Sequence, residues 1–455
     1  AIRQHPYLCA MNRIRIAWLA IFVILSVVYW GSLNSVELTM EPWALRKSLL
    51  YYSGIVAIGM MSVGMILAMR LHWVESWLGG LDTHYRLHKW LGVSAVLAAV
   101  VHWLVKLEPK WLAKHGFVAP DTFKTPAGTV GFFDHADPFH VIRGFAKDVG
   151  EWTIYALIVL AIIAIWRRLP YRGFFKTHRL MAIVYLLLAF HSIVLFSKLG
   201  WNSPIGVLTG SLMAAGLIGA LVSLFGRTGH RHQHEGTISR IVGHESDNMI
   251  EIHLKVDQGW PGHHAGQFAF LTFTHQEGAH PFSISSAWDP ASRDISFHIK
   301  RLGDFTNTLP ENLTLGQAVR IEGPYGRFEF EPEEADQIWI AGGVGLTPFL
   351  ARLQAIADEP VSKPIHFYLC VRNAETDVVQ TIRALCKNAG VTLSTIVSGS
   401  HAPLTGAQVR AENPDWKDAH VWFCGPAGLG QAVRQDLVGH GLSAKRFHQE
   451  LFEMR

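Results

Sequence analysis

Residues 82–106 read DTHYRLHKWLGVSAVLAAVVHWLVK, an apolar stretch long enough to cross a lipid bilayer as a helix. His88 lies near one end of this stretch, and His102 lies near the other end, 14 residues further along the chain. On an α-helix this separation corresponds to about 21 Å and nearly four full turns, so both rings would project from almost the same face. The stretch therefore predicts a membrane span with one imidazole near each end.

A second stretch repeats this arrangement. Residues 177–198 read THRLMAIVYLLLAFHSIVLFSK, and His178 and His191 are 13 residues apart. Ionisable side chains inside a membrane span are costly and need a partner, so two similar pairs at similar depths call for one explanation. The simplest explanation is two b-type haems stacked across the membrane, with each iron held by one imidazole from each helix. The candidate haem ligands are His88, His102, His178 and His191.

Alternatives remain open for these histidines. Each one, taken alone, is also compatible with an ordinary interfacial residue, and His84, one turn before His88, is a competing ligand. His84 has no matching residue on the second helix, which makes it the weaker candidate. On an ideal helix, residues 13 apart do not share a face, so His191 would point in a different direction from His178. The haem assignment therefore requires either local overwinding of the helix or two haems that lie in different directions around the helix axis.

The composition limits the class of protein. The chain has 455 residues, enough for more than one domain, and 49% of them are apolar, but the long apolar runs lie within the first 226 residues. A formal net charge of +4 is too small to argue for nucleic-acid binding, so no nucleic-acid partner is expected. The four cysteines form neither a CxxC pair nor a disulfide framework: Cys9, Cys370, Cys386 and Cys424.

Six membrane spans are expected in the N-terminal half. Besides the two histidine segments, apolar runs lie at residues 14–33, 48–69, 152–166 and 204–225. The first of these runs has no small-residue cleavage pattern after it, so it is interpreted as a retained span and not as a signal peptide. Six spans place both ends of the chain on the same side of the membrane.

The basic residues predict which side is cytoplasmic. Arginine and lysine gather in residues 3–15, 167–176 and 227–231, and such clusters mark cytoplasmic loops. Both histidine segments then run outward. Topology alone therefore pairs one histidine of each segment at the inner level and one of each at the outer level: His88 with His178, and His102 with His191.

After residue 234 the pattern becomes that of a soluble α/β protein. Residues 236–326 contain short alternating strands separated by Gly, Pro and Asp turns, which predict a small antiparallel barrel. From residue 336 strands alternate with helices, which predicts a parallel sheet of nucleotide-binding type. The expected architecture is multi-domain: a six-helix transmembrane domain (1–230), an FAD-binding antiparallel β-barrel (235–330) and an α/β nucleotide-binding domain (335–455).

Residues 280–286 read HPFSISS and form the candidate flavin motif. A flavin needs an aromatic or apolar wall for its ring system and a hydroxyl near N5, where hydride arrives; Phe282 and Ser283 suit these roles. The later stretch FHIKRLGDFT (297–306) suits a pyrophosphate. The candidate flavin residues are His280, Pro281, Phe282, Ser283, Ser285, Ser286, His298, Lys300, Gly303 and Thr306.

Two later motifs are typical of nicotinamide-nucleotide binding. AGGVGLTP (341–348) follows a strand and opens a helix, where glycines let backbone N–H groups approach a diphosphate. The alternative for this motif is a plain glycine-rich turn. Cys424-Gly425-Pro426 ends a later strand, where a nicotinamide could lie beside Cys424; the alternative for Cys424 is a small buried core residue. The candidate residues are Gly342, Gly343, Val344, Gly345, Leu346, Thr347 and Pro348, followed by Cys424, Gly425 and Pro426.

Taken in order, HPFSIS, GGVGLTP, CGP and the C-terminal Glu450-Leu451-Phe452 form a specific set. The soluble half resembles the ferredoxin-NADP reductase fold. Essentially the whole chain after the first span resembles the NADPH oxidase and ferric reductase superfamily in a compact bacterial form. Two features depart from the oxidases: the chain has no EF-hand pattern, and Lys106 stands where some oxidases have histidine.

The resemblance implies roles for individual residues. Phe282 and Ser283 would contact the flavin, His280 takes the place where soluble relatives often have arginine, and AGGVGLTP would hold the NADPH pyrophosphate. Arg372 matches a position that often binds the 2′-phosphate, so NADPH is favoured and NADH is the alternative. The residues expected nearest the redox step are Ser283, Cys424, Glu450 and Phe452, with Phe452 stacked on the flavin until nicotinamide displaces it.

The expected function is electron transfer across a membrane, in a multi-pass protein embedded in lipid with its dehydrogenase domains in the cytoplasm of a bacterium. NADPH would reduce FAD, and two b-type haems would pass electrons to an outer acceptor. Molecular oxygen giving superoxide is the favoured acceptor, and a ferric chelate is the alternative. A third alternative is a periplasmic protein partner that docks on the loop formed by residues 107–149.

Overall fold

The computed structural model describes residues 6–33, 41–78, 80–119, 122–123, 139–166, 171–196, 200–274, 278–331, 335–357, 363–400 and 402–450. The chain divides into two compact units. One unit is helical and contains residues 13–78 and 83–229. The other contains residues 230–455 together with the short segments 1–12 and 79–82.

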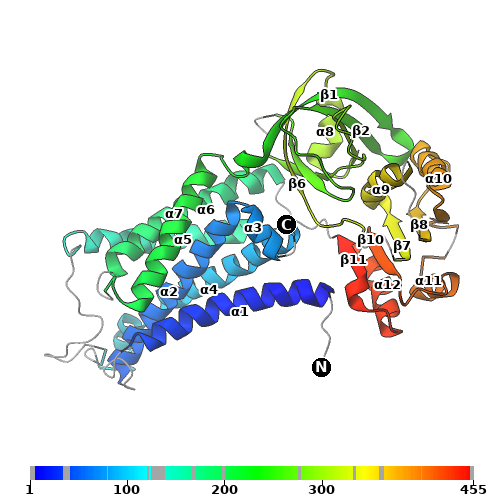
Figure 1. Ribbon diagram of the computed structural model, residues 1–455. Helices are drawn as coiled ribbons and strands as arrows, with labels where there is room; N and C mark the ends of the chain where they lie inside the picture. Colours follow the sequence, from blue (N-terminus) through cyan, green and yellow to red (C-terminus); the bar gives the residue numbers. More distant parts are fainter. Residues whose placement is uncertain are drawn as a thin grey trace. The chain divides into compact units, whose positions relative to one another are not determined.

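The first unit is built from long apolar helices (Figure 1). Among the described residues, six helices are long and apolar enough to cross a membrane, which confirms the predicted number of spans. Many large apolar side chains, such as Val27, Leu97 and Ile162, are exposed on their outer faces, as expected for helices that face lipid. The six helices are α1 (Pro6–Gly31), α2 (Pro42–Ala68), α4 (Leu81–Lys114), α5 (Arg143–Ile165), α6 (Tyr171–Phe196) and α7 (Pro204–Leu224).

The helices differ from the sequence prediction mainly at their ends. Helix α2 begins at Pro42 instead of residue 48, and α5 begins at Arg143 instead of residue 152. Hydropathy marks only the apolar part of a span, whereas the hydrogen-bonded helix continues into its polar flanks. One additional short helix, α3 (His72–Leu78), lies before α4 and was not expected.

Close packing joins α2, α6 and α7 inside this unit. The Tyr185 hydroxyl of α6 lies 2.9 Å from Ser62 Oγ of α2 and donates to the Met213 carbonyl of α7 at 3.2 Å. Gly219 lets the α7 and α2 backbones approach, because a Cβ there would lie 2.5 Å from the Met65 carbonyl oxygen. Small residues at such contacts are typical of membrane helix bundles.

The antiparallel part of the second unit is a six-stranded sheet. Alternate residues of β2, such as Ile252 and Leu254, face a buried core that also contains Phe297 of β5. The sheet curls so that its two end strands approach, and the Ser285 N–H donates to the Ser296 carbonyl at 2.8 Å. In sheet order the strands are β4 (His280–Ser283), β3 (Phe268–Thr272), β6 (Ala318–Tyr325), β1 (Gln233–His244), β2 (Met249–Val256) and β5 (Asp294–Lys300).

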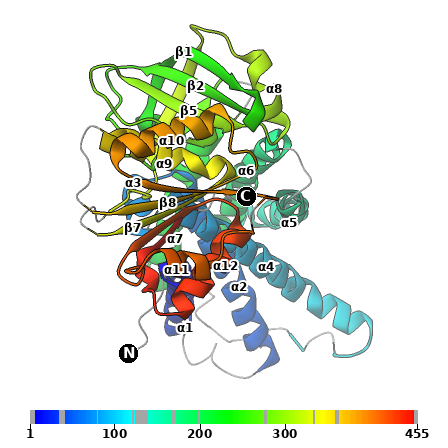
Figure 2. The ribbon, with the colours of Figure 1, turned by 90° about the vertical axis from the view of Figure 1, so that its right-hand side faces the viewer.

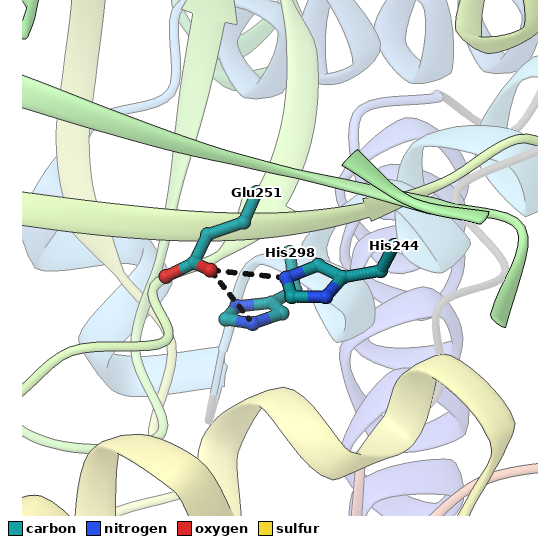
Figure 3. A group of neighbouring side chains, drawn as sticks. All are labelled: His244, Glu251 and His298. Carbon is teal, nitrogen blue, oxygen red and sulfur yellow. Dashed lines mark hydrogen bonds and ion pairs between the residues drawn. The ribbon is translucent and has the colours of Figure 1, made fainter. Parts of the chain in front are cut away.

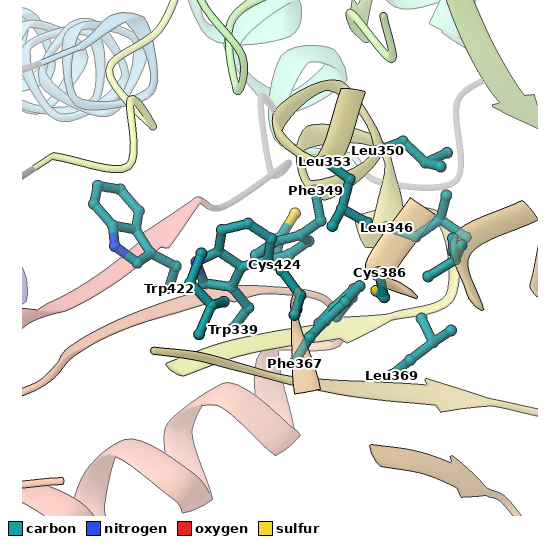
Figure 4. Close-up of a cluster of buried hydrophobic side chains, with 14 of the residues drawn as sticks. Trp339, Leu346, Phe349, Leu350, Leu353, Phe367, Leu369, Cys386, Trp422 and Cys424 are labelled. Atoms are coloured by element: carbon teal, nitrogen blue, oxygen red, sulfur yellow. The ribbon is translucent and has the colours of Figure 1, made fainter. Parts of the chain in front are cut away.

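The α/β part contains a parallel five-stranded sheet, with helices on both faces (Figure 2). Trp339, Phe349 and Phe367 pack together in the core on the side of α9 and α10 (Figure 4). In sheet order the strands are β11 (Phe447–Glu450), β10 (His420–Cys424), β7 (Gln337–Gly342), β8 (Ile365–Val371) and β9 (Thr392–Val397). The helices are α9 (Thr347–Ala357), α10 (Asp377–Ala389), α11 (Gly406–Glu412) and α12 (Ala427–Gly439).

This strand order locates the ligand-binding edge. Within this sheet the first strand in the sequence is the central β7. The next two strands, β8 and β9, are added on one side of β7, and the last two, β10 and β11, are added on its other side. The strand order therefore reverses between β7 and β10. In open parallel sheets, ligands bind outside the carboxyl ends of the strands at such a reversal. The predicted fold class, six membrane helices followed by an antiparallel FAD-binding domain and an α/β domain, is confirmed.

Candidate functional site

The four membrane histidines form two pairs between helices α4 and α6. The ring centroids of His88 and His178 are 5.9 Å apart, with an angle of 72° between the ring planes. The centroids of His102 and His191 are 6.4 Å apart, at 88°. These are the pairs that topology predicts, and the 13-residue spacing on α6 does not prevent the second pair from forming.

Backbone carbonyls of neighbouring helices orient three of the four rings. In each case Nδ1 donates to a carbonyl oxygen of α2 or α5: His88 to Gly64 at 2.9 Å, His102 to Leu50 at 2.8 Å, and His191 to Ala146 at 2.7 Å. A carbonyl can only accept, so Nδ1 carries the proton and Nε2 keeps a free lone pair. An imidazole held in this way is ready to bind a metal through Nε2.

The fourth histidine is held differently. The His178 ring stacks on Phe174, with centroids 5.1 Å apart and planes 17° apart. Its Nδ1 is buried and has no hydrogen-bond partner among the described residues. The competing candidate His84 directs Nε2 at the Leu67 carbonyl, 2.6 Å away. Its Nδ1 is buried with no hydrogen-bond partner in the described part of the chain, but the ring packs edge-on against Tyr85, with centroids 6.2 Å apart, and not against a described histidine of α6, so His84 belongs to neither pair.

The spacing within each pair fits one metal ion between two rings. With metal–nitrogen bonds of about 2 Å on opposite sides of one ion, the centroids of two imidazoles lie about 6 Å apart. The observed separations of 5.9 and 6.4 Å agree with this value. The two pairs therefore suit bis-histidine ligation of two haem irons.

Two glycines that the sequence analysis did not single out make room for these rings. A Cβ at Gly54 of α2 would lie 3.1 Å from His102 Nδ1, and a Cβ at Gly150 of α5 would overlap the His191 ring. Each glycine follows the carbonyl that accepts the histidine's proton by four residues, which is one helical turn. No signal in the sequence reveals this role, because it depends on which helices are neighbours.

A salt bridge lies close to the second pair. Lys106, one turn beyond His102 on α4, places Nζ 2.7 Å from Glu151 Oε2 on α5. Glu151 directly follows Gly150 in the chain, so the ion pair and the His191 contact share one turn of α5. The charge of Lys106 is therefore balanced by a carboxylate.

In the second unit, the nicotinamide motifs meet at the strand-order reversal. Cys424 at the end of β10 is opposite Ala341 of β7 and opposite Glu450 of β11. AGGVGLTP begins with the last two residues of β7, and the exposed Arg372 follows β8 at the same edge. The structure thus brings the predicted turn, Cys424, Glu450 and Arg372 to one end of the sheet. Phe452 lies outside the described residues.

Glycines allow the two turns to touch. A Cβ at Gly345 would overlap the Cys424 carbonyl, and a Cβ at Gly342 would lie 2.7 Å from Pro426 Cδ. Gly425 in turn approaches the Gly342 backbone, since its Cβ would lie 3.0 Å from the Gly342 nitrogen. The GGVG turn and the Cys424-Gly425-Pro426 turn are therefore packed backbone against backbone.

The chemistry of this edge excludes a nucleophilic thiol. Cys424 is fully buried, and burial together with the nearby Glu450 carboxylate raises the pKa of its thiol well above the usual value. The thiol therefore stays protonated at pH 7. Lys300 of β5 reaches the same region, because a Cβ at Gly343 would lie 3.8 Å from Lys300 Nζ.

The flavin motif forms β4 and the turn after it. Ser283 is buried, and its Oγ has no hydrogen-bond partner in the described part of the chain, as expected for a hydroxyl that contacts a bound ring. His280 stacks on Phe305 with centroids 4.0 Å apart and planes 5° apart. Burial lowers the pKa of His280 to about 4, so this side chain is neutral at pH 7.

Several other candidate flavin residues bond within the protein. Ser285 Oγ lies 2.9 Å from both Ser296 Oγ and His298 Nδ1. Ser286 Oγ accepts from the Ser296 N–H at 3.0 Å. Thr306 Oγ1 accepts from the N–H groups of Leu302 and Gly303 at 3.0 and 3.1 Å and so caps helix α8 (Asp304–Asn312). Pro281 and Phe282 are half-buried on β4.

Comparison with known families matches both halves of the chain. Residues 53–189 match the family described as ferric reductase like transmembrane component, and residues 237–329 match the FAD-binding domain family. The first matched segment contains three of the four paired histidines, and His191 lies just beyond its end.

Comparison with curated proteins finds more distant relatives. The chain is 27% identical over 199 residues to the CDP-6-deoxy-L-threo-D-glycero-4-hexulose-3-dehydrase reductase of Yersinia pestis, covering 41% of this chain and 59% of that protein. It is 26% identical over 196 residues to the toluate 1,2-dioxygenase electron transfer component of Pseudomonas putida, covering 41% and 58%. The chain thus spans about three fifths of the length of these relatives.

Among solved structures, the flavohem-like FAD/NAD binding domain of nitric oxide dioxygenase from Vibrio cholerae is similar. It is 20% identical, with a TM-score of 0.41, and the match covers 48% of this chain and 98% of that one. A ferredoxin reductase of carbazole 1,9a-dioxygenase matches with 20% identity and a TM-score of 0.42, covering 48% of this chain and 69% of that one.

Proposed function

Because the chain has the domain architecture of the NADPH oxidase and ferric reductase superfamily, an oxidoreductase that transfers electrons across a membrane, we propose that NADPH is its donor and molecular oxygen its acceptor. Electrons pass from cytoplasmic NADPH through FAD and two b-type haems to the outer side of a bacterial inner membrane. One NADPH leaves NADP⁺ and a proton in the cytoplasm, and its two electrons reduce two oxygen molecules to two superoxide ions on the outer side. The observation that carries the proposal is the two cross-helix histidine pairs, in which three of the four rings keep Nε2 free.

FAD, when bound, accepts a hydride and releases its electrons singly, and haem carries one electron at a time. The protein supplies position and burial. His88 and His178 would hold one haem, while His102 and His191 would hold the other. With two histidine ligands each, neither haem would offer an open position, so we expect the acceptor to react at the edge of the outer haem.

The ion pair between Lys106 and Glu151, close to the outer pair, is the feature that favours oxygen over an anionic ferric chelate. Lys106, which alone would attract anions, is neutralised by Glu151 at 2.7 Å. A neutral diatomic acceptor needs no such attraction, whereas a negatively charged chelate gains little from a balanced pair. Ferric-chelate reduction and transfer to a periplasmic protein remain the alternative functions, because both use the same haem edge.

The test uses the purified full-length protein with haem and FAD in detergent. After NADPH is added, superoxide-dismutase-sensitive reduction of cytochrome c is compared with ferric-chelate reduction in the absence of oxygen. Fast dismutase-sensitive turnover is expected. Slow oxygen turnover with fast anaerobic iron reduction would make the protein a ferric reductase. Haem reduction without turnover of either acceptor would favour a protein partner.

Arg372→Ala is expected to weaken the preference for NADPH. Arg372 is exposed at the carboxyl end of β8, where its guanidinium can pair with the 2′-phosphate that distinguishes NADPH from NADH. Loss of this charge-assisted contact, worth about 1.5–3 kcal/mol, should raise the KM for NADPH by about 10- to 100-fold and leave the KM for NADH nearly unchanged. Steady-state flavin reduction with both nucleotides measures the ratio. Equal changes with the two nucleotides would refute the assignment.

Gly150→Ala is expected to disturb the outer haem selectively. The added methyl group would overlap the His191 ring and push it from its bond with the Ala146 carbonyl. The matched control is Gly144→Ala on the same helix, because a Cβ at Gly144 meets no atom within 4 Å. Haem content and the reduced-minus-oxidised spectrum should change for one haem in Gly150→Ala and for neither in Gly144→Ala. Identical spectra for the two variants would contradict the proposed ligation.

A further inference from the structure

Three side chains converge on the polar face of the antiparallel sheet: His244 and Glu251, which have no role in the electron-transfer proposal, and His298, a candidate flavin residue (Figure 3). Glu251 of β2 is directly opposite His298 of β5, and His244 lies at the end of β1. The Glu251 Oε2 atom is 3.1 Å from His244 Nε2 and 3.8 Å from His298 Nε2. All three atoms lie within 4.8 Å of one another. Both imidazoles therefore point at the same carboxylate oxygen.

The spacing of these atoms is that of ligands around one ion. A separation of 3.8 Å is too long for a hydrogen bond, so His298 is not simply bonded to Glu251. Ligand atoms about 2.0–2.2 Å from a tetrahedral zinc ion lie about 3.3–3.6 Å from one another. The two measured separations fall on either side of this range. Small movements of the three side chains would therefore bring all three atoms to ligand distance from one zinc ion. The fourth coordination position would then be left for water.

A second layer of hydrogen bonds fixes two of the three groups, His298 and Glu251, whereas His244 Nδ1 is buried with no hydrogen-bond partner among the described residues. Ser285 Oγ lies 2.9 Å from His298 Nδ1, which directs the other ring nitrogen toward Glu251. His253 Nε2 lies 2.9 Å from Glu251 Oε1, and Asp294 Oδ2 lies 3.3 Å from His253 Nδ1. Oε1 is thus occupied, and Oε2 is left toward the histidines. Partners of this kind orient metal ligands and tune their affinity.

The site is also shielded from solvent. The side chains of His244, Glu251 and His298 are only 11%, 19% and 10% exposed. Two imidazoles and a carboxylate are a ligand set that zinc uses when one position stays open. We propose that His244, Glu251 and His298 bind a divalent transition-metal ion of the zinc type. This assignment gives His298 a role other than the flavin pyrophosphate, which a carboxylate this close would repel.

The test measures zinc binding by the intact protein with haem and FAD in detergent, after a chelator wash. Isothermal titration with Zn²⁺ should reveal one tight site per chain. Glu251→Gln keeps the shape but loses the ligand charge, and it should weaken this site more than the about 10- to 100-fold that loss of an outer hydrogen-bond partner costs. His440→Asn is the control, because its side chain is 54% exposed at the end of α12, away from the cluster.

X-ray absorption at the zinc edge supplies a second readout. Two imidazoles and one carboxylate in the first shell support the site, whereas a shell without them overturns it. Equal zinc affinity in the native protein, Glu251→Gln and His440→Asn would also overturn it, and the cluster would then be a hydrogen-bonded network alone. If His244→Ala or His298→Ala loses FAD and so reports misfolding, the isosteric Glu251→Gln variant decides. None of these readouts uses acceptor turnover, so the result is independent of the proposed function.

Discussion

His102→Ala and His191→Ala are each expected to remove the outer haem while NADPH still reduces the flavin and the inner haem. Each change deletes one of the two imidazoles whose rings face each other 6.4 Å apart, and the remaining histidine cannot ligate both faces of an iron. Haem content should fall from two per chain to one. Electron transfer to the outer acceptor should be lost. The inner haem at His88 would remain, but it lies about 21 Å along the helix from the level of His102, where the acceptor is reduced.

His88→Ala and His178→Ala should affect the inner haem and therefore stop electron flow before the outer one. His84→Ala is a demanding control, since His84 lies one turn from His88 on the same helix and is itself buried, at 1% exposure. Its Nε2 is engaged with the Leu67 carbonyl, so both haems should remain. Pyridine haemochrome analysis and reduced-minus-oxidised spectra measure these contents. If His102→Ala and His191→Ala both keep two full haems, the proposed pairing of histidine ligands would be refuted.

Much of this architecture can be predicted from the sequence because periodicity and composition act locally. The six spans follow from apolar length, and the segments MIEIHLKV and IHFYLCV coincide with β2 and β8. The histidine pairs follow from topology, since two helices that run in the same direction place corresponding ends together. AGGVGLTP and Cys424 lie side by side because both stand at the carboxyl ends of parallel strands that are neighbours where the strand order reverses.

Other features depend on contacts between segments and leave no trace in local sequence. The carbonyls of Leu50 and Ala146 that orient the histidines belong to helices with no polar signal at those positions. The role of Gly150 appears only once α5 and α6 are neighbours. The His244 and Glu251 contact likewise depends on the register of β1 with β2, which an isolated strand pattern does not reveal.

Gly345→Ala is expected to abolish most NADPH-dependent flavin reduction without loss of FAD or haem. The GGVG turn reaches the Cys424 turn only because Gly345 has no side chain; an added Cβ would overlap the Cys424 carbonyl, and a backbone atom cannot rotate away as a side chain can. One turn must therefore shift, and a displacement of about 1 Å from the reactive arrangement costs about 100-fold in rate. Anaerobic stopped-flow measurement of flavin reduction gives this rate directly.

The control for Gly345→Ala lies on the neighbouring helix. Gly428 is in the first turn of α12, directly after the Cys424 turn, and a Cβ there meets no atom within 4 Å. Gly428→Ala should therefore keep the native rate, although it adds the same methyl group at the same edge of the sheet. Chemical reduction with dithionite should still reduce the haems in both variants, which separates a nucleotide defect from a haem defect. Native flavin reduction in Gly345→Ala would show that hydride transfer does not depend on the contact between these two turns.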